Sequence, residues 1–564
     1  MSRMPHIGAE GRWRRIAEIA ACALGQAVAA GWAAFATRDV FAAIRNEDPS
    51  AATGSIAAIA CSGVIIAALR VRERVVSERV GQGYAAVLRE KLFNHVAAMP
   101  TTAVASYRSG ALALRFVGDL SSVRGWVGLG VGRLISAAIT LPAAAIVLIS
   151  LNPALGAAAI VPIAIGVTAV CVIGFLLAPA HRRLRSRRSR LAADMSERIA
   201  CAPELRLMGR MEIERRNMKR RTERLTQAAL TRAQGGGLLD AIPDAAAGAA
   251  AASLFTSAIL TGATAADVAG EMAALSILTH PMRRLAGVWD RHRAYAAARA
   301  KCERLLGAPK LKRHRRPRAD KARRVLGPTA PARLSFNAVT ARAIRNVTVE
   351  AAPGERIAVI GANGAGKSTL LTLAAGLELP MKGRVRIDGV APTSLTAAER
   401  RRAIAYVGGR SPILAGSLRR ALTMGCAERP DDADIFKTAA TYGFAAVIER
   451  LGGLDGQVSE AGRNLSAGEA RRLMLTRAAL IRPKLLLLDE PDDVLDPQGV
   501  GLLTRLYDET QATALVATHN IRTARAADAI WLVADGAVAA TGRPEDLDAR
   551  TGPIAEFFSL RPAA

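Results

Sequence analysis

Aromatic residues are scarce in this chain: Phe, Trp and Tyr together make up 4% of its 564 residues. Few rings are therefore available to line an apolar binding pocket, which argues weakly against a polyspecific drug site. The six cysteines are scattered along the sequence, with neither metal-ligand spacing nor the pattern of a disulfide framework. We therefore expect free thiols.

Acidic residues are also in short supply, because 48 Asp and Glu stand against 77 Lys and Arg and leave a formal net charge of +29. Yet 51% of the residues are hydrophobic. A basic and apolar chain either binds nucleic acid or spans a membrane with basic cytoplasmic loops. The apolar residues gather before Ala263 in blocks long enough to cross a bilayer. We therefore predict a lipid bilayer as a partner and no nucleic acid.

Five apolar segments are long enough, or nearly so, to cross about 30 Å of hydrocarbon. They are 16–36, 51–69, 134–151, 154–178 and 245–263. A sixth span must return the chain to its starting side, and only 268–288 leaves room for it. That stretch is weakly apolar, so we predict the sixth span only because the chain must cross the membrane once more.

Ionisable and polar groups inside membrane spans mark transport pathways by default. The candidates here are Glu18, Gln26, Glu271 and His280. Each of them can equally lie at the membrane interface or extend its polar end toward water. The transported substrate is not predicted by these residues.

Arginine and lysine set the expected orientation. Segments 70–133 and 180–240 are rich in basic residues, nearly all of them arginine, whereas 37–50 contains only Arg38 and Arg45. Basic loops stay in the cytoplasm, so both long segments are predicted to be cytoplasmic helical extensions. The basic run 310–324 fits a linker near anionic lipid headgroups better than a nucleic-acid site.

A glycine-rich loop lies between an apolar strand at 357–360 and a predicted helix at 369–377. Its spacing is that of a phosphate-binding P-loop, in which backbone N–H groups surround phosphate oxygens. Lys367 is expected to reach the β- and γ-phosphates, and the hydroxyl of Ser368 to bind Mg²⁺. The predicted nucleotide-binding residues are Gly361, Ala362, Asn363, Gly364, Ala365, Gly366, Lys367, Ser368 and Thr369.

A second apolar strand, 484–488, ends in Asp489 and Glu490. An acidic residue at that strand tip holds Mg²⁺ in P-loop proteins, which predicts Asp489 and Ser368 as the metal ligands. Glu490, one residue further, is suited to polarise the attacking water. A third strand, 514–518, ends at His519, which could contact the γ-phosphate. Strands that alternate with helices from about Arg333 predict a mostly parallel α/β domain.

With these motifs the chain resembles the exporter half-transporters of the ATP-binding cassette (ABC) family. Residues 465–469 are similar to the family signature LSGGQ, and 490–496 resemble the loop after the second strand. The resemblance implies a membrane α-helical bundle of six transmembrane helices followed by an α/β P-loop NTPase domain of ABC type. We predict a membrane domain over 1–309, a basic linker over 310–332 and a nucleotide-binding domain over 333–564.

The resemblance also implies that two nucleotide-binding domains meet head to tail. Each ATP would lie between one P-loop and the other subunit's signature, with Asp496 communicating across the interface. Bends in the cytoplasmic helices would rest on the nucleotide-binding domains. The signature residues for the partner's ATP are Leu465, Ser466, Ala467, Gly468 and Glu469.

Two features typical of the family are missing. No aromatic residue occurs in 337–342, where a ring would stack on adenine, and Arg342 is the substitute. Stacking on a base is worth ~1–3 kcal/mol, so its loss weakens ATP binding by roughly five- to a hundredfold. Gly409 stands where a glutamine would touch Mg²⁺ and face the membrane domain. Ala467 and Glu469 are milder changes within the signature.

The resulting hypothesis is an ATP-binding and permease subunit of an ABC exporter, with ATP and Mg²⁺ as cofactors and an unidentified substrate. Its predicted location is the bacterial inner membrane, multi-pass, with a cytoplasmic nucleotide-binding domain. The alternative is a catalytically impaired regulatory or channel subunit of a heterodimer. Glu490 and His519 favour hydrolysis, whereas Gly409 favours the alternative. A homodimer would repeat both deficits, so a heterodimer with a second half-transporter is preferred over a homodimer.

Overall fold

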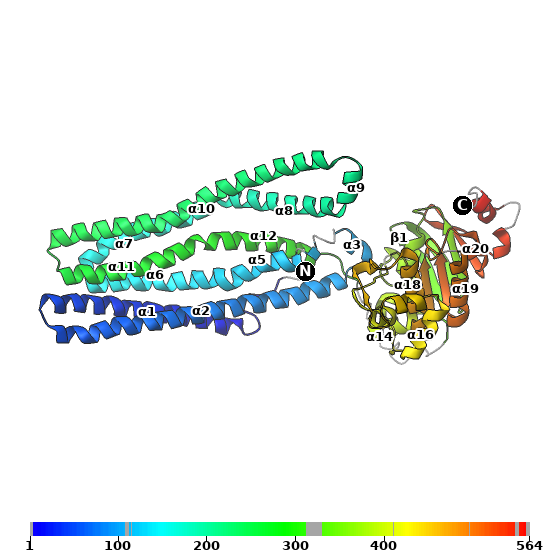
Figure 1. Cartoon of the computed structure of the whole chain (residues 1–564), viewed down its shortest axis with the longest axis horizontal. Coiled ribbons are helices and arrows are strands. Elements are labelled where there is room, and N and C mark those ends of the chain that lie inside the picture. Colours follow the sequence, from blue (N-terminus) through cyan, green and yellow to red (C-terminus); the bar gives the residue numbers. More distant parts are fainter. Residues whose placement is uncertain are drawn as a thin grey trace. The chain divides into compact units, whose positions relative to one another are not determined.

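A computed structural model describes residues 4–107, 112–113, 115–311, 330–409, 411–495, 497–547 and 552–559. The chain divides into two compact units, which Figure 1 shows as a set of long helices and a mixed α/β body. Unit 1 consists of Met1–Ala97 and Ser106–Ala308, and unit 2 of Ala98–Ala105 and Pro309–Ala564. The chain therefore enters unit 2 briefly, between two parts of unit 1.

All the regular secondary structure described in unit 1 is helical. Its helices are α1 (Arg12–Arg45), α2 (Pro49–Ala97), α5 (Leu120–Arg124), α6 (Val131–Leu151), α7 (Pro153–Leu176), α8 (Ala178–Ala200), α9 (Ala202–Leu207), α10 (Met211–Thr261), α11 (Ala265–Ala286) and α12 (Val288–Leu306). Two π-helical stretches, η1 (Arg115–Asp119) and η2 (Gly125–Gly130), flank α5.

Short connections join the long helices at one end, and local chemistry explains two of these turns. The side chain of Asn152 accepts hydrogen bonds from the backbone N–H of Ala154 and Leu155, which caps α7. Gly262 ends α10 in a left-handed conformation that glycine adopts without strain. Thr264 and Asp267 then form a capping box that starts α11.

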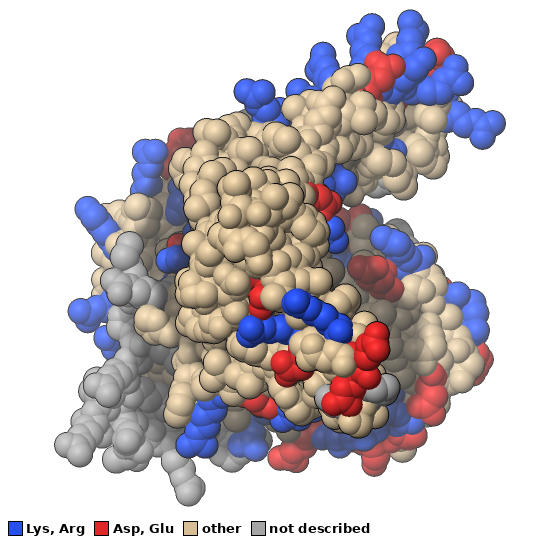
Figure 2. All heavy atoms as spheres, turned by 90° about the vertical axis from the view of Figure 1, so that its left-hand side faces the viewer, with Lys and Arg blue, Asp and Glu red and all other residues tan. Residues whose placement is uncertain are grey.

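Five helical stretches are long and apolar enough to cross a membrane: Arg12–Arg45, Ala52–Ala97, Arg115–Leu151, Pro153–Leu176 and Met211–Thr261. Figure 2, which looks onto the end with the short connections, shows a broad surface with few charged side chains, which gather at its lower part in this view. Exposed apolar residues such as Ile259 and Leu260 suit contact with lipid.

The helix α11 is not among those five stretches, so the sixth span stays a prediction. It packs against α1, α6, α7 and α10. Its Leu275, Leu278 and Met282 are buried in one core with Leu148 and Leu254. The packing therefore places α11 inside the helical bundle although its sequence is weakly apolar.

Unit 2 contains three sheets. The largest has the order β11-β10-β3-β9-β8-β5, with all neighbours parallel except β10 and β11. A second, antiparallel sheet has the order β2-β1-β4, and β6 pairs with β7. The strands are β1 (Leu334–Ala341), β2 (Ile344–Ala351), β3 (Arg356–Gly361), β4 (Lys382–Ile387), β5 (Ile404–Val407), β6 (Gly416–Ser417), β7 (Gln457–Val458), β8 (Leu485–Asp489), β9 (Thr513–Ala517), β10 (Ala529–Ala534) and β11 (Ala537–Gly542).

Helices cover the large sheet, and its central strands are buried on both faces. The helices of unit 2 are α3 (Thr101–Ala105), α13 (Lys367–Ala374), α14 (Ala397–Ala403), α15 (Leu418–Thr423), α16 (Asp432–Thr441), α17 (Ala445–Arg450), α18 (Ala467–Ile481), α19 (Pro497–Thr510), α20 (Ile521–Arg525) and α21 (Pro553–Ser559). Since β3, β8 and β9 run parallel, the residues that follow them meet at one edge of the sheet. The prediction of a helical membrane domain followed by an α/β domain is confirmed.

Candidate functional site

The glycine-rich loop joins β3 to α13, as its sequence predicted. Gly361 (φ 150°) ends the strand, and a Cβ atom there would lie 2.2 Å from the carbonyl oxygen of Val533. Gly366 (φ 117°) precedes the helix, and a Cβ atom there would lie 2.6 Å from Ile344. Only glycine satisfies both the backbone angles and the space at these two positions. The loop therefore presents backbone N–H groups at the N-terminus of a helix, the arrangement that binds phosphate.

Lys367 begins α13 and its ammonium group points back over the loop. The Nζ atom donates hydrogen bonds to the carbonyl oxygens of Gly361 (2.9 Å) and Ala362 (3.3 Å). It also lies 2.8 Å from Nε2 of His519, which follows β9. The side chain of Lys367 is buried, so the loop and the end of β9 hold its charge in one place.

Three oxygen-bearing side chains meet beside the loop. The hydroxyl of Ser368 donates to Oδ1 of Asp489 at 2.8 Å, and the hydroxyl of Tyr406 donates to Oδ2 at 3.0 Å. Mg²⁺ prefers oxygen ligands and takes one or two of them from a protein when a phosphate completes its shell. The hydroxyl and carboxylate of Ser368 and Asp489 therefore fit a magnesium ion.

Glu490 follows β8 in a left-handed conformation (φ 49°) that is uncommon for a non-glycine residue. Its backbone N–H donates to Ala517 O, and its Oε1 atom lies 3.6 Å from Nε2 of His519. Burial raises the pKa of the Glu490 carboxyl, and the neighbouring Asp493 raises it further, while Lys367 opposes both. A carboxylate with a raised pKa is a better proton acceptor than an ordinary glutamate.

The structure adds a buried charge cluster that the sequence patterns did not reveal. Oδ2 of Asp492 accepts hydrogen bonds from the hydroxyls of Thr518 and Thr523, both at 2.6 Å. Arg471 of α18 is 8% exposed, and its Nη1 atom has no hydrogen-bond partner among the described residues. Burial lowers the pKa of Arg471, and Asp493 and Asp492 oppose that shift. No motif predicted this pairing because it joins two helices and two strand ends.

The signature residues form the start of α18. Ser466 caps the helix and Glu469 completes a capping box by accepting from the Ser466 N–H. Arg450 of α17 donates to both carboxylate oxygens of Glu469 at 2.9 Å. The negative charge that replaces the neutral family residue therefore has a cationic partner within the same unit.

Two cavities flank the P-loop. One, of about 600 Å³, is lined by Ser368, Asp489 and Glu490; the other, of about 860 Å³, by Asn363 and Gly364. Arg342, exposed on the turn between β1 and β2, lines both. None of the five signature residues lines either cavity among the residues that the structure describes.

Gly409 is exposed at the rim of the smaller cavity, and a Cβ atom at this position would meet nothing within 4 Å. A longer side chain would therefore fit there. The position expected to hold a glutamine is open space in this chain. Asp496, the predicted interface residue, lies outside the described residues.

The short helix α3 borders the same cavity. Thr101 donates to the carbonyl oxygen of Leu377, and Thr102 donates to both carboxylate oxygens of Glu378. Thr101, Thr102 and Glu378 line the cavity with Ser368 and Glu490. A helix from the first basic segment thus belongs to the unit that holds the P-loop.

Comparison with known proteins agrees with this arrangement. The family model described as "ABC transporter transmembrane region" matches residues 19–278, and the one described as "ABC transporter" matches 344–493. The solved structure of a bacterial Atm1-family ABC exporter with ATP bound superposes with a TM-score of 0.82 at 21% identity and covers 99% of both chains. That likeness shows the fold.

Two curated relatives are similar over part of their length. The Beta-(1→2)glucan export ATP-binding/permease protein NdvA of Bradyrhizobium diazoefficiens is 33% identical over 43% of this chain and 41% of its own. The Mycobactin import ATP-binding/permease protein IrtB of Mycolicibacterium thermoresistibile is 36% identical over 38% of this chain and 37% of its own. The matched part spans less than half the length of each relative.

The chain thus combines a helical unit with several apolar spans and an α/β unit that carries a P-loop. The two family matches together cover well over half of the sequence. The chain belongs to the ABC transporter family and has the architecture of an exporter half-transporter.

Proposed function

We propose that this chain is the ATP-binding and permease subunit of an exporter, in which ATP binding and hydrolysis move an unidentified substrate across a bacterial inner membrane. One observation carries the proposal. Five side chains converge at one edge of the parallel sheet: Lys367, Ser368, Asp489, Glu490 and His519. Ser368 donates to Asp489 at 2.8 Å, and Nε2 of His519 lies 2.8 Å from Nζ of Lys367 and 3.6 Å from Oε1 of Glu490. That set contains a phosphate ligand, two metal ligands and a candidate base.

Each side chain has a role in this proposal. Lys367 binds the β- and γ-phosphates, and the loop residues 361–369 supply backbone donors. Ser368 and Asp489 hold Mg²⁺, which would neutralise charge on the phosphates. Glu490 orients the attacking water and accepts its proton, since its raised pKa suits a base. His519, which contacts Lys367 and lies near Glu490, donates to the γ-phosphate.

We further propose that the ATP sites are completed by a second subunit. The signature residues do not line the P-loop cavities of their own unit within the described residues. A second half-transporter would place its signature there, and this chain's Ser466 and Gly468 would serve the partner. Closure of two such units around ATP would favour one state of the membrane domain, and hydrolysis would reverse it.

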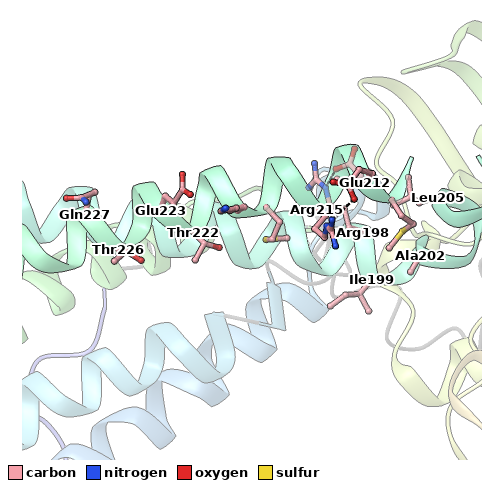
Figure 3. A pocket seen from close by; sticks show the side chains of 14 residues that line it. Arg198, Ile199, Ala202, Leu205, Glu212, Arg215, Thr222, Glu223, Thr226 and Gln227 are labelled. Atoms are coloured by element: carbon pink, nitrogen blue, oxygen red, sulfur yellow. Dashed lines mark hydrogen bonds and ion pairs between the residues drawn. The ribbon is translucent and has the colours of Figure 1, made fainter. Parts of the chain in front are cut away.

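The bend formed by α8, α9 and α10 is the proposed contact for the partner's nucleotide-binding domain. Figure 3 shows the cavity that these helices enclose, about 830 Å³ in volume, with Arg198, Leu205 and Glu212 among its lining residues. Leu207 and Met208, at the end of α9, are 88% and 68% exposed. Large apolar side chains left in water at a helix bend favour a protein contact.

The alternative is a catalytically impaired subunit, which the open position at Gly409 favours. ATPase activity in lipid nanodiscs, measured on the chain alone and on its complex with a second half-transporter, decides between them, with Glu490→Gln as the diagnostic variant and exposed Glu449→Gln as its control. We expect Glu490→Gln to lower turnover by about a hundredfold or more while ATP still binds. Parallel loss of binding and turnover would assign Glu490 a structural role and contradict the proposed mechanism.

A heterodimer remains the preferred partner arrangement, because a homodimer would repeat the missing ring and Gly409 in both sites. Co-expression of this chain with a second ABC half-transporter of six spans, encoded by a neighbouring gene, tests this arrangement. The chain alone should show low ATPase activity that rises when the second half-transporter is present. A stable homodimer as active as any mixed complex would rule out the heterodimer.

A further inference from the structure

A cavity of about 290 Å³ lies inside unit 1, between α1, α2, α6 and α11. Three arginines line it, one from each of three helices: Arg70 of α2, Arg133 of α6 and Arg284 of α11. His280 and Gln26 add two further nitrogen-bearing side chains. No Asp or Glu is among the described residues that line the cavity. The cavity wall is therefore basic.

Only one of these guanidinium groups has a counter-ion. Glu73, itself 2% exposed, accepts from Arg284 at 2.8 Å and from Nε2 of Gln26 at 2.9 Å. Arg70 and Arg133 form no ion pair or hydrogen bond with any residue that the structure describes. One carboxylate thus faces three guanidinium groups, and the site carries an uncompensated positive charge.

The polar lining continues deeper between the same helices. Ser136 and Thr140, 4% and 7% exposed, follow Arg133 on one face of α6. Ser276 and His280 precede Arg284 at helical spacing on α11. A lipid-facing arginine that merely reaches toward water needs no such polar stripe, whereas a cavity that receives a polar group does.

All three arginines lie at about the same distance along their helices from the end of unit 1 that carries the short connections. Each is about 20 residues, or ~30 Å, from the helix end that carries a short connection. That distance is the thickness of the hydrocarbon region, so the cavity lies at the inner boundary predicted from the basic loops. A molecule entering from the cytoplasm would meet it first.

We propose that this cavity binds the anionic group of the transported molecule, a carboxylate, phosphate or sulfonate, with Arg70 and Arg133 as its cationic ligands. This inference rests on the proposed function and narrows its substrate to organic anions. Guanidinium groups bind such planar or tetrahedral oxyanions with two parallel hydrogen bonds. The anion could belong to a free solute or to a lipid headgroup.

Binding of 5-carboxyfluorescein tests the proposal, with the cationic xanthene dye rhodamine 123 as its counterpart. Fluorescence anisotropy is measured on the full chain in phosphatidylcholine nanodiscs without nucleotide. Arg133→Gln is expected to weaken carboxyfluorescein binding by about tenfold or more, and Arg133→Lys to restore part of it. The control is Arg79→Gln, an exposed residue of α2 that does not line the cavity.

Equal affinity of the wild type and the Arg70→Gln/Arg133→Gln double variant for carboxyfluorescein would overturn the proposal, as would equally tight binding of rhodamine 123. Nanodiscs with phosphatidylglycerol distinguish the two sources. If phosphatidylglycerol weakens carboxyfluorescein binding to the wild type but not to Arg133→Gln, the site binds a lipid headgroup. If phosphatidylglycerol leaves carboxyfluorescein binding unchanged, the site binds a free solute. ATPase activity is read separately, so an active enzyme without dye binding contradicts only this inference.

Discussion

Glu378 holds the short helix α3 by both of its carboxylate oxygens: Oε1 accepts from the backbone N–H of Thr102 and Oε2 from its hydroxyl, each at 3.2 Å. The residue lies just after α13, the helix that begins at Lys367. The segment after the P-loop helix is thus linked to α3 by this side chain and by the hydrogen bonds of Thr101 to the carbonyl oxygen of Leu377.

Glu378→Ala should loosen α3 without unfolding its unit, since the hydrogen bonds to Leu377 remain. Loss of one such bond is worth ~1 kcal/mol, so amide exchange at Thr102 should rise about fivefold. Hydrogen–deuterium exchange over 98–105 measures this. Glu428→Ala, on an exposed loop, is the control. Unchanged exchange in Glu378→Ala would show that α3 is held by other contacts.

Lys367→Ala should abolish turnover and weaken ATP binding by about tenfold or more, because hydrogen bonds to charged groups contribute ~1.5–3 kcal/mol. Binding of a fluorescent ATP analogue and phosphate release provide the two measurements. Lys382→Ala, on exposed strand β4, should behave as wild type. Normal ATPase activity in Lys367→Ala would remove the P-loop assignment.

The pair Arg450–Glu469 predicts a charge-dependent rescue. A backbone hydrogen bond from Ser466 lowers the pKa of Glu469, and Arg450 lowers it further, so the carboxylate is ionised at neutral pH. Arg450→Ala leaves that charge without its partner beside the signature and should reduce ATPase activity about two- to fivefold, within the range of an exposed pair. Adding Glu469→Gln should restore it. If the double variant is no more active than Arg450→Ala, the unpaired charge of Glu469 does not explain the reduced ATPase activity.

If Glu490 is the proposed base, its pKa sets the acid limit of hydrolysis. A base must be deprotonated to act, so a raised pKa moves the loss of activity to higher pH than an ordinary glutamate would. Asp493→Asn removes one contribution that raises this pKa, and the acid limb of the pH–activity profile should then shift to lower pH. Asp455→Asn, exposed and remote, should leave the profile unchanged. An upward shift in Asp493→Asn would contradict this electrostatic account.

Gly409→Gln should fold normally, because a side chain at this position has open space. If the missing amide limits metal binding, the variant should hydrolyse ATP several times faster than wild type at low Mg²⁺ concentration and similarly at high concentration. A magnesium titration of ATPase activity checks this. Equal ATPase activity of the variant and the wild type at every Mg²⁺ concentration would mean that Gly409 does not impair metal binding. That result would also weaken the case for a heterodimer.

The local motifs were predictable because each depends on short spacing. The P-loop at 361–369 needs only a strand, glycines and a helix in succession. Asp489, Glu490 and His519 follow apolar runs, and parallel strands bring their ends to one edge of a sheet. The apolar blocks of α1, α2, α6, α7 and α10 were equally visible, since a bilayer demands long uncharged stretches.

Tertiary structure alone decided which distant residues became partners. The pairs Glu378–Thr102 and Arg450–Glu469 join elements whose sequences carry no periodic signal for the contact. The same holds for Arg70, Arg133 and Arg284, which looked like scattered basic residues until three helices brought them around one cavity. Hydrophobic patterning and turn chemistry act over a few residues and fix the elements. Side-chain pairing depends on how those elements pack, which no short stretch of sequence encodes.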